Sequence, residues 1–206
     1  MAYVGETRTP LGLPQGSVRA ILALLITVSF WLMVLLPNPE NGKPLHVPLN
    51  LYFLLAFPFM FFVSYGRSMA DAEDNEPHPL GMPPFLVKFI ILFGTAGVLG
   101  FQYHYNFDQL KARLTPDAET LQNGYRFAAA LFGGFMFGYI MRALPFRNSA
   151  LFQFFHAWLS MIAMILLVIE IVIHAFIQPS MEGTIDVVAF EIAITAIVAT
   201  YFATRS

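Results

Sequence analysis

Residues 150–177 read ALFQFFHAWLSMIAMILLVIEIVIHAFI, and this stretch decides the fold class. Roughly 20 apolar residues in a helix cross a bilayer core of about 30 Å. With Ser149 added, a helix over 149–177 would be roughly 43 Å long at about 1.5 Å per residue. Such a helix spans a membrane with a tilt or with one end protruding. The sequence therefore predicts a transmembrane helix over 149–177.

Five other segments have the same apolar character, so each is also predicted to be a transmembrane helix. The chain is 57% hydrophobic and only 12% charged, whereas soluble domains contain about 25% charged residues. Ser17 is a predicted N-cap of the first helix, and Thr184 is a predicted N-cap of the last. We expect an all-α, polytopic integral membrane protein with six transmembrane helices in a single domain over residues 1–206. The other predicted spans are 18–37, 49–66, 85–103, 126–144 and 184–203.

Lysines and arginines near the ends of the spans predict that both termini lie on the inner side, because positive residues are enriched there. In this orientation the inner side carries more positive residues than the outer side. We expect the membrane to be the inner or plasma membrane of a prokaryote, or an organelle membrane. The inner residues are Arg8, Arg19, Arg67, Lys88, Arg142, Arg147 and Arg205, and the outer residues are Lys43, Lys111, Arg113 and Arg126.

Composition and motifs exclude several classes of function. The chain has no cysteine, which excludes disulfides, iron–sulfur clusters and thiolate zinc sites. Its net charge of −2 gives no basis for nucleic-acid binding. The sequence contains no Walker A, H-E-x-x-H or G-x-S-x-G motif, so we assign no catalytic residue and expect no enzyme. No metal or cofactor is assigned, and bound lipid is the one ligand expected.

Two glutamates and a histidine within apolar segments are the strongest candidates for function, because ionisable side chains are costly to place in hydrocarbon. Glu170 and His174 lie one helical turn apart in the span 149–177, and Glu191 lies in the next span. Each glutamate is eight residues from the turn that connects the two spans, a depth of roughly 12 Å. We therefore predict that Glu170, Glu191 and His174 form a proton or cation site.

Four arrangements would satisfy such carboxylates, and the sequence leaves all of them open. The glutamates can share a proton, pair with the His174 imidazolium or bind a cation, and each of these arrangements allows transport. Hydrogen bonds to Thr195, Thr95 or Gln102 would instead form a structural clasp between helices, and a glutamate can also reach a partner subunit.

Polar residues recur at helical spacing on three of the predicted spans, so each of these spans carries a polar stripe on one face. In the span 149–177 the stripe runs from His156 to His174. His156 is also a candidate ligand for a haem or pigment, although a lone histidine in a membrane is more often a hydrogen-bonded structural residue. The residues predicted to support the site are His156, Ser160, Thr95, Gln102 and Thr195.

Small residues form two further patterns that predict close helix packing. Small residues at a spacing of four allow the backbones of two membrane helices to approach closely. The sequence does not show whether the neighbouring helix belongs to this chain or to another. The predicted packing residues are Ala130, Gly134 and Gly138 in one span and Gly94, Gly97 and Gly100 in another.

Two main hypotheses for function follow from these features. In the first, the chain is a non-catalytic membrane subunit that assembles with other membrane subunits, or with copies of itself, in the lipid bilayer. In the second, it is a small proton- or cation-conducting channel or transporter that uses the predicted Glu170, Glu191 and His174 site. A third hypothesis is a redox- or pigment-binding membrane subunit.

Overall fold

The computed structural model describes residues 16–37, 45–59, 79–116, 121–144, 149–180 and 186–205. Throughout these ranges the regular structure is helical, with no strand, as an all-α fold requires. Several predictions fall outside the described ranges, namely the N-cap at Thr184, the second half of the span 49–66, and the charges of Arg8, Lys43, Arg67 and Arg147.

Each predicted span coincides with a helix over the residues that are described. The helix of the fifth predicted span, α7 (Ala150–Val172), continues without a break through a π-helical turn, η7 (Ile173–Ile177), into α8 (Gln178–Ser180). Short helices η5 (Pro79–Gly81) and α4 (Phe107–Leu114) flank the third span. The helices that correspond to the six predicted spans are α1 (Ser17–Leu35), α2 (Leu49–Pro58), α3 (Pro84–Tyr105), α6 (Gly124–Ala143), α7 (Ala150–Val172) and α9 (Val188–Arg205).

Three of these helices are long and apolar enough to cross a membrane, fewer than the six that the sequence predicts. They are Ser17–Leu35, Leu86–Tyr105 and Phe154–Ser180, and two shorter apolar helices cover Leu49–Pro58 and Val188–Thr204. The difference has local causes: glycines and arginines dilute the apolar character of α6, α2 is described for only 10 residues, and the apolar part of α9, Val188–Thr204, is shorter than any of the three. The three apolar helices support a membrane protein.

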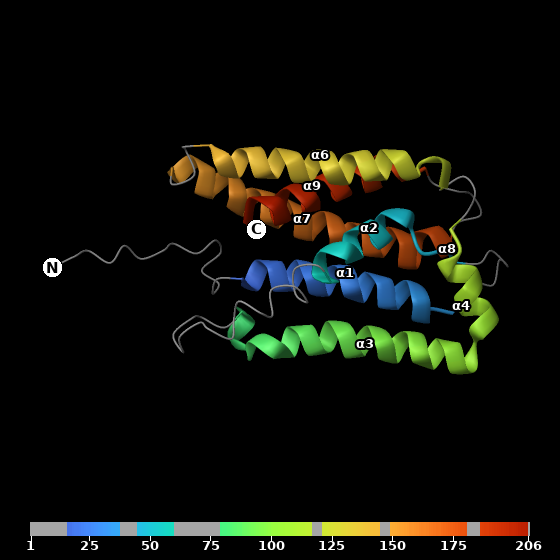
Figure 1. The fold of residues 1–206 in the computed structure, drawn as a ribbon. Helices are drawn as coiled ribbons and strands as arrows, with labels where there is room; N and C mark the ends of the chain where they lie inside the picture. The colour runs from blue at the N-terminus through green and yellow to red at the C-terminus, as the bar shows by residue number, and fades with distance from the viewer. Residues whose placement is uncertain are drawn as a thin grey trace.

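The helices form an elongated bundle in which successive long segments of the chain alternate in direction. α1, α3 and α7 run one way, and α2, α6 and α9 run the opposite way (Figure 1). α1 packs against α2, α3 and α7, whereas α9 packs against α2, α6 and α7. Helices α2 and α7 therefore join the α1–α3 pair to the α6–α9 pair. The beginning of α1 and the end of α9 lie at the same end of the bundle (Figure 1).

The α6–α9 contact is the most extensive one, and it depends on two glycines. A Cβ atom at Gly134 would collide with the backbone of Ala196, and a Cβ atom at Gly138 would collide with the carbonyl of Thr200. Thr200 Oγ1 donates to the Gly134 carbonyl at 3.0 Å. The helix that packs against the small-residue pattern of Ala130, Gly134 and Gly138 is therefore α9 of the same chain.

The glycines of α3 behave differently from one another. Gly94 lies against the indole of Trp31 on α1, and Trp31 Nε1 donates to Thr95 Oγ1 at 3.0 Å. Gly97 and Gly100 have no atom of the described chain within 4 Å of a Cβ placed there. Only the first of the three α3 glycines thus contributes to packing between α1 and α3.

The predicted N-cap at Ser17 is wrong. Gly16 occupies the N-cap position with a φ of 85°, a left-handed conformation that suits glycine. The Ser17 hydroxyl instead accepts a hydrogen bond from the Leu80 backbone N–H at 2.8 Å. Ser17 therefore links the start of α1 to η5 rather than capping its own helix.

Arg113 of α4 holds the C-terminal end of α1. The side chain is 1% exposed, and Nη1 donates to the carbonyls of Met33 at 3.0 Å and Val34 at 2.7 Å. Gln102 Nε2 donates to the Val34 carbonyl as well, at 2.9 Å. Burial lowers the pKa of the Arg113 guanidinium, while the carbonyls at a helix C-terminus, which carry partial negative charge, favour a cation. The predicted outer-side charge thus points into the bundle.

Replacing Arg113 with methionine should lower the free energy of unfolding by about 2–3 kcal/mol, because the carbonyls at the end of α1 lose a charged donor. The matched control is Lys111→Met on the same helix, where the side chain is exposed and the expected change is within about 0.5 kcal/mol. Unfolding by SDS titration in mixed micelles measures both variants. Equal stability of the two would contradict this role for Arg113.

Candidate functional site

The polar stripe predicted on α7 faces the interior of the bundle. His156, Ser160, Glu170 and His174 are all buried, as are the apolar members of the stripe. Alternating steps of four and three residues keep them on one face of a helix with 3.6 residues per turn. The polar stripe that the spacing predicts therefore lies on the buried face of this helix.

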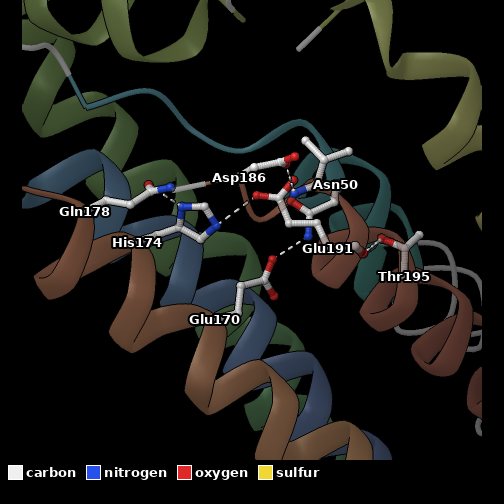
Figure 2. A network of polar contacts seen from close by, with 8 residues as sticks. Asn50, Glu170, His174, Gln178, Asp186, Glu191 and Thr195 are labelled. Carbon is white, nitrogen blue, oxygen red and sulfur yellow. Dashed lines mark hydrogen bonds and ion pairs between the residues drawn. The ribbon is translucent and has the colours of Figure 1, made fainter. Parts of the chain in front are cut away.

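His174 and Glu191 form an ion pair between η7 and α9. His174 Nε2 lies 2.9 Å from Glu191 Oε1, although the N–H direction is not aligned as a hydrogen bond requires. His174 Nδ1 lies 2.8 Å from Gln178 Oε1. An imidazole with a hydrogen on each nitrogen can donate to both of these oxygens. The arrangement in Figure 2 therefore suits an imidazolium between a carboxylate and an amide oxygen.

Glu170 has a different partner, which comes from α2. Asn50 Nδ2 donates a hydrogen bond to Glu170 Oε1 (Figure 2). Asn50 is fully buried and Glu170 is 4% exposed. Glu170 Oε2 and Asn50 Oδ1 are both buried and have no hydrogen-bond partner among the described residues. The bond therefore satisfies one atom of each side chain and leaves one oxygen of each without a donor.

The two glutamates belong to one buried cluster, but they do not bond to each other. Within the described ranges no hydrogen bond joins the carboxyls of Glu170 and Glu191. Glu191 is 5% exposed and His174 is 7% exposed, so the cluster is shielded from solvent. Its members come from α2, α7, η7 and α9, which meet in Figure 2.

No protein-family model, curated protein or solved structure matches this chain. Its functional interpretation therefore depends on the chemistry of the site itself. Among the described residues, no three side chains of the kind that ligate metals are grouped around a common point.

Two of the predicted supporting residues lie at the other end of α7. Thr204 Oγ1 lies 3.2 Å from His156 Nδ1, and the His156 ring stacks on Tyr201 with 5.0 Å between ring centroids. The Ser160 hydroxyl donates to the Ala157 carbonyl of its own helix at 2.7 Å. His156 is 14 residues before Glu170, which separates them by roughly 21 Å along the helix. Neither residue supports the cluster directly.

The other three predicted supporting residues also have partners away from the two carboxylates. The Thr195 hydroxyl donates to the backbone carbonyl of Glu191 at 2.8 Å, not to its carboxylate. The Thr95 and Gln102 side chains bond to Trp31 and to the carbonyl of Val34 on α1. The structural clasp considered above, in which Thr195, Thr95 or Gln102 bonds to a glutamate side chain, is therefore made by other residues.

A π-helical turn lies at the cluster. His174 is in η7, where the Gln178 backbone N–H donates to the Ile173 carbonyl, five residues earlier. Pro179 follows the turn and has no N–H to donate to the carbonyl of Ala175. Single π-helical turns within α-helices occur frequently at functional sites. This turn is therefore a second feature, independent of charge, that marks the region around His174.

Asn50 and Gln178 are site residues that the sequence interpretation missed. Asn50 lies in LNLYFLLAF, residues 49–57, where the phenylalanines and leucines dominate the pattern. A single amide in such a segment is itself a signal, because an unsatisfied polar side chain is costly there. Gln178 follows His174 by four residues, a spacing that puts two side chains on the same helix face.

Proposed function

We propose that this chain is a six-span integral membrane protein that conducts protons or another small cation through the cluster of Glu170, His174 and Glu191. Support for six spans comes from the alternating directions of α1, α2, α3, α6, α7 and α9 and from the common position of the start of α1 and the end of α9 (Figure 1). An even number of crossings returns a chain to its starting side.

The outer surface of the bundle also supports a lipid environment. Large apolar side chains on α3, α6 and α7 are exposed, and they extend along most of each helix. An apolar surface of this extent suits hydrocarbon and would be costly in water. These side chains include Phe89, Phe93 and Phe101 on α3, Phe132, Phe137 and Ile140 on α6, and Phe154, Ile162, Ile165 and Val172 on α7.

One observation supports cation conduction most strongly: three ionisable side chains are buried in one network between helices of a membrane bundle. Burying an ionisable group in a membrane costs several kcal/mol, whereas Gln or Asn side chains would connect the same helices at lower cost. Carboxyl and imidazole groups add the ability to take up and release protons. Asn50 and Gln178 orient the ionisable groups without titrating themselves.

The test is cation flux in proteoliposomes under an imposed pH gradient, followed with a trapped pH-sensitive dye. The wild-type chain should collapse the gradient, and Glu170→Gln and Glu191→Gln should each reduce the rate to that of empty vesicles. His156→Gln is the matched control, since it changes a buried ionisable residue of the same helix outside the cluster. Absence of flux in the wild type, or full flux in both glutamine variants, would sink the proposal.

A second candidate function, a membrane subunit of a larger assembly, is favoured by one surface of α3. Gly97 and Gly100 leave open space at their Cβ positions, and exposed Phe93 and Phe101 flank them. Small residues beside aromatic ones allow another transmembrane helix to approach closely. Under this proposal, Gly97→Leu should disrupt an oligomer or a complex in mild detergent, as measured by native mass spectrometry.

A further inference from the structure

We infer that the cation at this cluster is a proton, and that Glu170 holds it as a neutral carboxylic acid paired with the Asn50 amide. The inference rests on the proposed function, because it names the species that the cluster carries. The unsatisfied oxygen of Glu170, the charges of the cluster and the hydrogen-bond donors that face each carboxyl group support it.

The unsatisfied oxygen of Glu170 favours the protonated state of its carboxyl group. Glu170 Oε2 and Asn50 Oδ1 are buried acceptors without a donor in the described chain, and they belong to two side chains that are already bonded to each other. A buried polar atom without a partner costs about 1–3 kcal/mol. A hydrogen on Oε2 turns this oxygen from a buried acceptor without a donor into a donor, and it removes the charge from a carboxyl group that has only one hydrogen-bond partner.

The charges of Glu170, His174 and Glu191 sum to zero only when Glu170 is protonated. The titratable groups around Glu170 are His174 on its own helix and Glu191 on α9, while α2 contributes Asn50, which does not titrate. α1 also packs against α7 and has no titratable residue after Arg19. The His174–Glu191 ion pair is neutral as a unit. An ionised Glu170 would leave one uncompensated negative charge in the cluster, which is costly, whereas a protonated Glu170 leaves the cluster neutral.

The hydrogen donors that face the two carboxyl groups favour a proton over a metal cation. A metal ion in an oxygen site needs several lone pairs directed at it in place of its hydration shell. Here Asn50 presents an N–H to Glu170, and the His174 imidazolium faces Glu191. Hydrogen donors directed at the carboxyl groups repel a metal ion but are compatible with a proton that moves between oxygen and nitrogen atoms. Within the cluster, the His174 imidazolium can pass its Nε2 proton to Glu191 Oε1, 2.9 Å away, which leaves a neutral imidazole and a neutral carboxylic acid.

Infrared spectroscopy of the purified full-length chain in detergent tests the inference without relying on transport. The wild type should show the C=O stretching band of a protonated carboxylic acid, with a shift on transfer to D2O. Glu170→Gln should remove this band, while Glu191→Gln should keep it. Asn50→Ser, which retains Glu170 but changes its partner, should move the band and gives a second measurement if Glu170→Gln does not fold.

The outcomes separate this inference from the proposed function. A spectrum without the band, or a band that survives in Glu170→Gln and is lost in Glu191→Gln, overturns the assignment of the proton to Glu170. A band that depends on Glu170, in a chain that carries no flux in proteoliposomes, supports the protonated acid and contradicts conduction. Flux without such a band supports conduction and contradicts the protonated acid.

Discussion

Replacing Gly138 with leucine is expected to lower the free energy of unfolding by about 3 kcal/mol, because an overpacked contact forces neighbouring groups to shift. Even a Cβ atom at this position meets the Thr200 carbonyl and the Ala203 side chain on α9. Backbone atoms of a packed helix cannot rotate away as the end of a flexible side chain can. The α6–α9 pair must therefore separate to admit the new side chain.

Gly97→Leu provides the matched control for this substitution. It makes the same chemical change in a helix of similar length, but at a position with no described atom within 4 Å of the new Cβ. Its effect on the stability of the isolated chain should stay within about 0.5 kcal/mol. Thermal unfolding in detergent compares the two variants. If Gly97→Leu destabilised the monomer as much as Gly138→Leu, the α6–α9 contact would not be the cause.

The second large effect is expected at the His174–Glu191 ion pair. Glu191→Leu alone or His174→Leu alone should cost about 3–5 kcal/mol, because each leaves the other partner buried without compensation. The double variant should be more stable than the sum of the two single effects predicts, since two apolar side chains can replace a buried pair at little cost. The cycle is measured by SDS-titrated unfolding in mixed micelles.

Thr195→Val is the control for the ion-pair cycle. Its hydroxyl bonds only to the backbone carbonyl of Glu191 in its own helix, so its removal should have a small effect. If the effects of Glu191→Leu and His174→Leu on the free energy of unfolding were strictly additive, the two side chains would not interact. This result would contradict the ion pair between His174 and Glu191.

Much of the fold could be predicted because apolar length and helical spacing are local properties of a sequence. The third span was expected over 85–103, and α3 covers Pro84–Tyr105. The stripe on α7 was predicted from spacing alone, and its members His156, Ser160, Glu170 and His174 are buried. Glu170 and Glu191 were predicted to lie together because each is eight residues from the turn, and both belong to the buried cluster. The six-span count remains a proposal, because three helices meet the length and hydropathy of a span.

The pairing of side chains could not be predicted, because it depends on the rotation of each helix and on segments far apart in the chain. Glu170 meets Asn50 of α2, and Glu191 meets His174, so the two glutamates do not share a proton directly. Arg113 was counted among the positive charges on the outer side, but its side chain is buried and donates to carbonyls at the end of α1.

The most direct test of the central claim is cation flux with three different side chains at position 170. Wild-type glutamate, Glu170→Asp and Glu170→Gln are reconstituted at equal density in proteoliposomes, and the decay of an imposed pH gradient is recorded. Our proposal predicts rapid decay with glutamate, slower but measurable decay with aspartate, which keeps the carboxyl group at a shorter reach, and background decay with glutamine. Decay with glutamine at the wild-type rate would contradict a role for the Glu170 carboxyl in conduction.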